Sequence, residues 1–116
     1  MARLPQKRRS KYGAVKTTID GITFASKAEA RRYGQLLLLA RAGHITRLIL
    51  QPVYRIFAHP LGGDPVQVAK YVGDFQYETR EGQKVVEDVK GVKTPVYRLK
   101  KKLVEAAYAI QIREIR

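Results

Sequence analysis

Two runs of β-branched and aromatic residues, at 71–75 and 85–91, constrain the fold of this chain most. Such residues favour strands, and turn formers bound both runs. Because successive side chains of a strand point to opposite faces, Asp88 and Lys90 are predicted to share one face, whereas Glu87 lies on the other. An acid and a base therefore stand side by side on one strand. Glu87 is expected to pair with a basic residue on the opposite face.

The two runs are predicted to form a hairpin, because residues 78–82 have the composition of a tight turn. Asp74 is the only charge in its own run, and this pairing would bring it close to Asp88. Two carboxylates and Lys90 at one sheet edge predict a site for a hard cation, Mg²⁺ or Mn²⁺. Such a site suits the hydrolysis of a phosphodiester.

The charge balance indicates a polyanionic partner. The chain has 116 residues, enough for one domain, and 23 Lys and Arg against 10 Asp and Glu give a net charge of +13. Such an excess predicts binding to nucleic acid or another anionic surface. The absence of cysteine excludes disulfides, thiolate catalysis and most zinc sites. No signal peptide or membrane span is recognisable, so a cytoplasmic location is expected.

The basic residues form two clusters without acids. Residues 1–16 show no apolar period and are predicted to be a flexible arm, distinct from a single domain at 17–116. The second cluster falls at a helix start near residue 95. Each cluster has an alternative interpretation as a solvated face that only aids solubility. The residues predicted to contact nucleic acid are Arg8, Arg9, Lys11, Tyr12, Lys93, Tyr97, Arg98, Lys101 and Lys102.

The remaining pattern predicts an α-β-β-β-α-β order, that is, a mixed sheet flanked by helices in an α/β (α+β) fold. Asp20-Gly21 predicts a preceding hairpin. The predicted elements are a hairpin at 17–24, a helix from Ser26 to about Ala42 capped by Gly43, strands at 45–57, 66–77 and 83–90, a helix from Thr94-Pro95 to about Tyr108, and a strand at 110–115. The strand at 45–57 is expected to be interrupted or bent at Pro52. In the second helix the predicted buried stripe is Val96, Leu99, Leu103, Ala106 and Ile110, which leaves Arg98, Lys101 and Lys102 outward.

Glu29 has two interpretations. It lies on the apolar stripe of the first helix with Tyr33 and Leu36, so its carboxylate is expected to face the sheet. It also completes the capping-box pattern that begins at Ser26, in which the glutamate returns to the first amides of the helix. Capping and metal binding are compatible, because a capped helix start is rigid.

Together these residues resemble the PD-(D/E)XK nuclease superfamily. The resemblance rests on Ser26-Lys27-x-Glu29, Gly73-Asp74-Phe75, Glu87-Asp88-Val89-Lys90-Gly91 and the segment 94–103, and it covers about residues 11–116. More closely, the chain is similar to small phage-encoded proteins catalogued as a domain of unknown function and related to phage junction-resolving endonucleases. Gly73 departs from the pattern, since it stands where the motif has proline.

The resemblance implies a four-stranded mixed sheet and a metal-dependent endonuclease. Asp74 and Asp88 would be the motif acids, Lys90 its lysine and Glu29 the additional helix glutamate. Asp74, Asp88 and the carbonyl of Val89, with Glu29 completing the shell, would ligate one or two Mg²⁺ or Mn²⁺ ions. Lys90 would orient or deprotonate the nucleophile, or stabilise charge on the phosphate.

The resemblance further implies branched or structured phage DNA as substrate, a homodimer, and action inside a bacterial host. Gln51, before Pro52, is a weak candidate for the same site. The alternative function is a noncatalytic basic DNA-binding protein of phage replication or packaging. Clustered carboxylates favour the nuclease, because they repel phosphate unless a cation intervenes.

Overall fold

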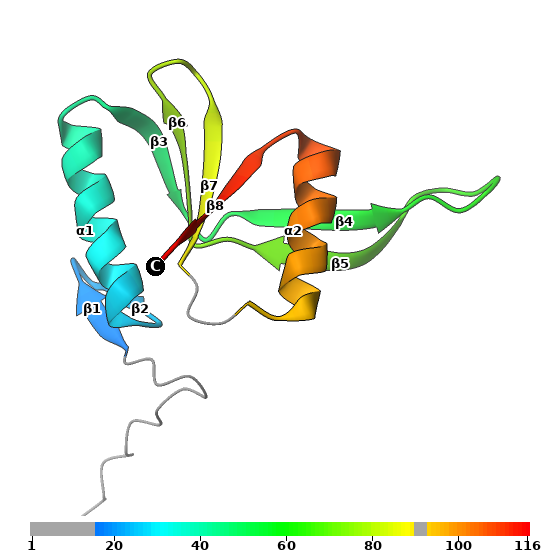
Figure 1. Ribbon diagram of the computed structural model, residues 1–116, viewed down its shortest axis with the longest axis horizontal. Coiled ribbons are helices and arrows are strands. Elements are labelled where there is room, and N and C mark those ends of the chain that lie inside the picture. Colours follow the sequence, from blue (N-terminus) through cyan, green and yellow to red (C-terminus); the bar gives the residue numbers. More distant parts are fainter. Residues whose placement is uncertain (1–15, 90–92) are drawn as a thin grey trace, which may run out of the picture.

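A four-stranded mixed sheet lies between two helices in the computed structural model, which describes residues 16–89 and 93–116 (Figure 1). Helix α1 covers one face and helix α2 covers the other. The strands, in spatial order, are β3 (Ile45–Leu50), β6 (Phe75–Thr79), β7 (Lys84–Val89) and β8 (Gln111–Ile115), and the helices are α1 (Lys27–Arg41) and α2 (Pro95–Tyr108). Neighbouring strands are antiparallel except β7 and β8, which are parallel. The predicted α/β (α+β) class, with a mixed sheet flanked by helices, is confirmed.

The N-terminal hairpin turns, and both helices begin, where local sequence signals predict. The N-terminal hairpin joins β1 (Thr17–Ile19) to β2 (Ile22–Phe24) through Asp20 and Gly21, whose φ angles of 51° and 77° are those of a type I′ turn. The Ser26 hydroxyl accepts the Glu29 N–H at 3.1 Å and caps α1. Thr94 caps α2 in the same way, with proline in the first helical turn.

Side chains alternate along β7 as predicted, and the two faces of the sheet carry separate core clusters. Val85 and Glu87 face α1, where the core contains Phe24, Ala30, Tyr33, Leu36, Ile45, Phe75 and Tyr77. Val86 faces α2, in a core with Tyr54, Ile56, Tyr71, Tyr97, Val104 and Ile112. Both clusters consist mainly of side chains from distant parts of the chain, so burial of apolar surface joins the layers.

The predicted strand at 45–57 is interrupted at Pro52, as expected, whereas the predicted continuous strand at 66–77 is wrong, because it is divided at Gly73 and Asp74. The first becomes β3 and β4 (Val53–Ala58), the second β5 (Val66–Val72) and β6, and β4 pairs with β5 in a separate two-stranded ribbon that projects from the sheet (Figure 1). The breaks lie side by side: the Gln51 N–H donates to the Asp74 carbonyl at 3.0 Å and the Gly73 N–H to the Pro52 carbonyl at 2.9 Å. Both segments therefore leave the central sheet at one point.

The predicted buried stripe of α2 is also wrong. Tyr97 and Val104 are the buried residues, whereas Val96, Leu99 and Leu103 are exposed. The helix packs through the flank that meets β8 and the base of the ribbon, a choice that helical periodicity alone does not make, because α2 carries apolar residues on two flanks.

No helix within residues 16–89 and 93–116 is long and apolar enough to cross a membrane. The single domain at 17–116 stays a prediction. The predicted flexible arm falls almost wholly outside the described residues.

Candidate active site

The structure brings Asp74 next to Asp88 at the end of the β6–β7 hairpin. Asp74 directly precedes β6, and its N–H donates to the carbonyl of Glu87 at 2.9 Å. Its carboxylate accepts the N–H of Val89 at 2.6 Å through Oδ2. These two bonds reach the residues on either side of Asp88 and hold Asp74 beside it. The predicted proximity of the two aspartates is confirmed.

Asp88 is an almost fully buried acid, with 2% of its surface exposed. The hydroxyl of Tyr71, on the ribbon strand β5, donates to its Oδ2 at 2.5 Å. Burial raises the pKa of Tyr71, and the carboxylates of Asp88 and, more weakly, Asp74 raise it further. The hydroxyl therefore stays protonated and remains a donor at every physiological pH. Tyr71 thus ties the ribbon to the paired aspartates.

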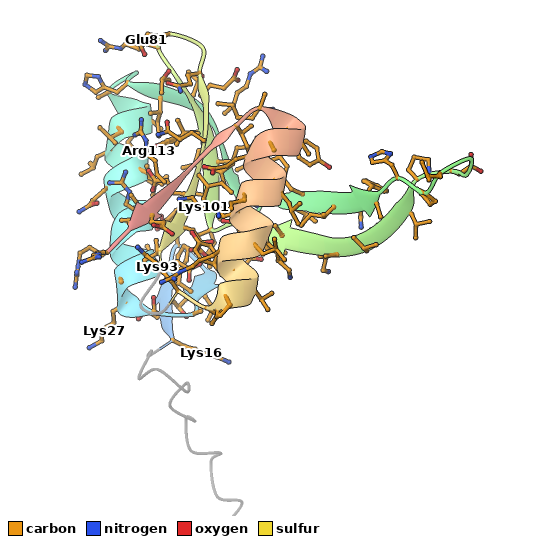
Figure 2. All side chains as sticks on the ribbon, turned by 45° about the vertical axis from the view of Figure 1, so that its right-hand side comes forward. Lys16, Lys27, Glu81, Lys93, Lys101 and Arg113 are labelled. Atoms are coloured by element: carbon orange, nitrogen blue, oxygen red, sulfur yellow. The ribbon has the colours of Figure 1, made fainter. Side chains whose placement is uncertain are left out.

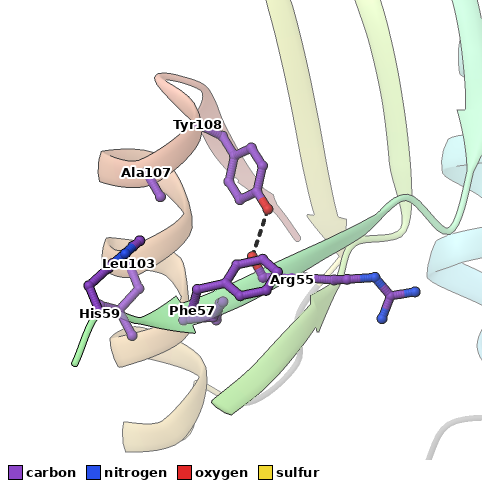
Figure 3. Close-up of a pocket in the computed structure, with 7 residues that line it drawn as sticks. Arg55, Phe57, His59, Leu103, Ala107 and Tyr108 are labelled. Atoms are coloured by element: carbon purple, nitrogen blue, oxygen red, sulfur yellow. Dashed lines mark hydrogen bonds between the residues drawn. The ribbon is translucent and has the colours of Figure 1, made fainter. Parts of the chain in front are cut away.

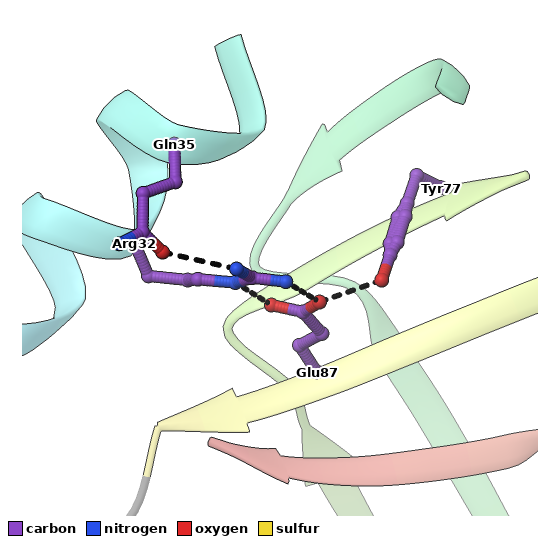
Figure 4. Close-up of polar contacts among 4 residues, drawn as sticks. All are labelled: Arg32, Gln35, Tyr77 and Glu87. Carbon is purple, nitrogen blue, oxygen red and sulfur yellow. Dashed lines mark hydrogen bonds and ion pairs between the residues drawn. The ribbon is translucent and has the colours of Figure 1, made fainter. Parts of the chain in front are cut away.

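Glu87 lies on the opposite face of β7, as predicted, and pairs with a base there. Arg32 of α1 donates to it from two of its guanidinium nitrogens, Nε to Oε1 at 2.7 Å and Nη2 to Oε2 at 2.6 Å (Figure 4). The Tyr77 hydroxyl donates to the same Oε2 at 2.6 Å, and Arg32 also donates to Gln35 at 3.0 Å. Burial raises the pKa of Tyr77 to about 12, and the hydrogen bond to Glu87 is the second cause of this rise. This bidentate pair joins α1 to the sheet and is separate from Asp88.

Glu29 is buried in the first turn of α1, as its position on the helix stripe predicts. Its backbone N–H completes one half of the capping box with Ser26. Within the two ranges that the structure describes, no group of three or more His, Cys, Asp or Glu side chains is placed to hold a metal ion. The structure therefore pairs Asp74 with Asp88 but does not add Glu29 to them. A metal-binding role for Glu29 stays a prediction.

The donors at this edge nevertheless fit a hard cation. The carboxylates of Asp74 and Asp88 and the carbonyl of Val89, the last residue of β7, are oxygen donors from one short stretch of the sheet. Mg²⁺ is commonly bound by one or two carboxylates, with water and substrate phosphate filling its other positions, so a full protein cage is not needed. Lys90, which follows Val89, lies outside the described residues, as do Arg8, Arg9, Lys11 and Tyr12.

A third carboxylate near Asp88, Glu114, was missed by sequence reasoning. The parallel pairing of β7 and β8 sets Asp88 opposite Glu114, on the same face of the sheet. Lys93 binds Glu114 at 2.9 Å and Lys101 lies 3.9 Å from it; both lysines are labelled in Figure 2. The hydrogen bond from Lys93 lowers the pKa of Glu114. The alternation of β8 could have placed Glu114 on this face, but only the tertiary pairing identifies its neighbour.

The other predicted contacts of α2 divide into two groups. Arg98 and Lys102 are exposed, as predicted. Lys101 is turned toward Glu114 and only 27% of its side chain is exposed, so its predicted outward orientation is wrong. Tyr97 is buried beside Tyr71, with ring centroids 6.4 Å apart, and is therefore not available to stack on a substrate base. Burial raises the pKa of Tyr97, and the nearby Glu114 and Asp88 raise it further.

Gln51 lies at the break beside Asp74. Besides the bond from its N–H to the Asp74 carbonyl, it has a φ of 52°, in the left-handed region that side-chain-bearing residues seldom occupy. Strained backbone of this kind gathers at functional sites. The structure therefore places the backbone of this weak candidate next to the paired aspartates.

These features define an α+β protein whose mixed sheet carries paired, hydrogen-bonded aspartates close to lysines. Residues 9–115 match the model of the family described as "Protein of unknown function (DUF1064)", and the chain belongs to this family. No curated protein and no solved structure matches the chain. The family description states no activity, so function has to be inferred from the site.

Proposed function

We propose that this protein is a metal-dependent endonuclease that hydrolyses phosphodiester bonds in DNA, with the core of the PD-(D/E)XK nuclease superfamily. The pairing of Asp74 with Asp88 carries the proposal. The chain has a net charge of +13 and yet places two carboxylates together at one sheet edge. Carboxylates that face a polyanion repel it unless a cation lies between them.

The residues of the site have separable roles in this proposal. Asp74 and Asp88 hold Mg²⁺ or Mn²⁺ with the Val89 carbonyl, and the bond from Tyr71 fixes the orientation of Asp88. The bound ion supplies neutralisation of the phosphate charge and a lower pKa for an attacking water. Lys90 takes up the proton of the water or stabilises the charge that develops on the phosphate as the bond to the leaving oxygen breaks.

The basic residues around the site support a DNA substrate. Lys93 and Lys101 meet at Glu114, the cross-strand neighbour of Asp88, so two cations stand close to the aspartates. Arg98 and Lys102 extend positive charge over the exposed flank of α2. Phosphate contacts of this kind position a duplex without reading its sequence. Branched or structured DNA is the proposed substrate, and a homodimer would supply two active sites, one for each strand.

The test is cleavage of matched duplex, single-stranded, flap and four-way-junction DNA with Mg²⁺ or Mn²⁺. Asp88→Asn and Lys90→Ala should each lower the rate by orders of magnitude and leave folding intact, because asparagine still accepts from Tyr71. Asp64→Asn, in an exposed loop, and Lys84→Ala, at the other end of β7, are the matched controls and should cut normally.

Two outcomes would contradict the proposal. Normal cleavage by both Asp88→Asn and Lys90→Ala would show that the site is assigned wrongly. Tight DNA binding by the wild-type protein, without cleavage of any substrate in either metal, would favour a noncatalytic DNA-binding protein instead.

A further inference from the structure

The exposed apolar surface is concentrated on one side of the molecule. Among the described residues, all the exposed large apolar side chains except Leu38 and Ile49 lie on α2 or on the β4–β5 ribbon and its loop. Scattered apolar residues are normal on a protein surface, but a gathered set marks an interaction site. This distribution therefore points to an interaction surface on α2 and the ribbon.

The set is centred where α2 meets the ribbon. Phe57, Leu103 and Tyr108 line a pocket of about 250 Å³ in the angle between the two elements (Figure 3). The Tyr108 hydroxyl donates to the carbonyl of Arg55 at 2.7 Å and holds helix and ribbon together there. Val96 and Leu99 continue the flank of Leu103 along α2, at helical spacing. We call Phe57, Val96, Leu99, Leu103 and Tyr108 the apolar corner.

The apolar corner is exposed in a way that the sequence pattern does not anticipate. Val96 is 62% and Leu99 59% exposed, although both lie on a helical stripe whose periodicity is that of a buried face. The isolated chain packs α2 through Tyr97 and Val104 instead and leaves this second stripe uncovered. The second apolar flank of α2 is therefore accessible to a partner.

We propose that the apolar corner and the adjacent ribbon form the surface through which a second copy of this chain docks. The residues outside the described ranges are poor candidates for covering it, because 1–15 are rich in Lys and Arg and show no apolar period. Nucleic acid is a poor occupant too, since these side chains offer phosphate no hydrogen bond. This surface would be the interface of the proposed endonuclease homodimer, and in this respect the inference rests on the proposed function.

Shape and area both suit self-association. A two-fold interface uses the same patch on both copies, so it needs projecting and recessed parts within one patch. The β4–β5 ribbon projects from the sheet (Figure 1), and the pocket beside α2 is recessed (Figure 3). The ribbon of one copy can therefore lie against α2 of the other. Besides the five side chains of the corner, Val66 and Val68 of the ribbon and Leu61 of its loop are exposed, and together they can supply much of the ~800 Å² per partner that a standard interface buries.

The experiment is sedimentation velocity over a wide range of protein concentration, with Leu99→Glu as the disrupting variant and Leu38→Glu as its control. Both leucines are exposed on helices, at 59% and 66%, so neither change should disturb folding. For the wild type and Leu38→Glu, the mass obtained from sedimentation should be twice the 13.2 kDa of one chain. Leu99→Glu should weaken the dimer at least about a hundredfold. Added salt should strengthen the wild-type dimer, since the two copies are both highly positive.

A second measurement uses the absence of cysteine from the chain. Single cysteines at Val96, Leu99 or Leu103 should give covalent dimers with a thiol cross-linker, whereas a cysteine at Leu38 should not. A wild-type protein that is monomeric at all concentrations would overturn the proposal, as would a dimer that Leu99→Glu leaves intact. Monomers that bind anionic vesicles through Leu99 would instead identify a membrane surface as the occupant. None of these readouts depends on DNA cleavage, so the nuclease can fail while the dimer stands.

Discussion

Replacement of Gly73 by alanine tests how tightly the active-site edge is packed. Gly73 is buried between β5 and β6, directly before Asp74. A Cβ at this position would lie 2.8 Å from Cγ1 of Val86 and 3.3 Å from Cγ of Pro52. Val86 is fully buried in the central strand β7 and, as a β-branched residue, has little rotamer freedom with which to move aside. The added methyl group therefore forces the backbone itself to shift.

The expected cost follows from that overlap. Overpacking of a dense core typically lowers the free energy of unfolding by about 1–3 kcal/mol. Each kcal/mol corresponds to roughly 4–8 °C in Tm for a domain of this size. Gly34→Ala is the matched control: its Cβ would meet nothing within 4 Å, and alanine in a helix interior should raise stability by about 0.5–1 kcal/mol.

Thermal and urea unfolding of both variants, followed by circular dichroism, measure these effects. Gly73→Pro should be worse than Gly73→Ala, because proline also loses the N–H that donates to the Pro52 carbonyl. This bond gives a physical reason for glycine where the resembling motif has proline. A Gly73→Ala protein as stable as the wild type, or a Gly73→Pro protein more stable than Gly73→Ala, would refute the reasoning.

Two further predictions concern the hydrogen bonds of the site. Tyr71→Phe removes the donor that orients the Asp88 carboxylate, so the rate of DNA cleavage should fall although the fold is kept; a variant that cleaves at the wild-type rate would contradict this. The hydrogen bond from Lys93 lowers the pKa of Glu114 below its usual 4.5. The ion pair therefore stabilises the fold fully above pH 4.5, and this stabilisation is lost as the pH falls through the lowered pKa. Glu114→Gln should therefore cost up to ~1 kcal/mol at neutral pH in urea unfolding and almost nothing at a pH well below 4.5. A cost that persists in acid would show that the ion pair is not its cause.

The functional chemistry could be located from the sequence only in part. Strand alternation correctly separated Asp88 from Glu87, and the turn at 78–82 correctly predicted the hairpin that brings Asp74 to Asp88. The roles of Tyr71 and Glu114 were not predicted. Tyr71 lies on β5 and Glu114 on β8, and each of these strands is positioned by pairing with another strand, β4 and β7 respectively. Tyr71 lies on the ribbon, whose existence depends on the adjacent breaks at Pro52 and Gly73.

The sequence by itself determined the features that depend on a few neighbouring residues: the turn at Asp20-Gly21, the caps at Ser26 and Thr94, and the alternation along β7. Backbone sterics and hydrogen bonds between residues close in the chain decide these. Only the tertiary structure decided which flank of α2 is buried and which strand adjoins Asp88. Those outcomes depend on contacts between residues far apart in the chain, where several apolar surfaces compete for the same partner and local periodicity does not select among them.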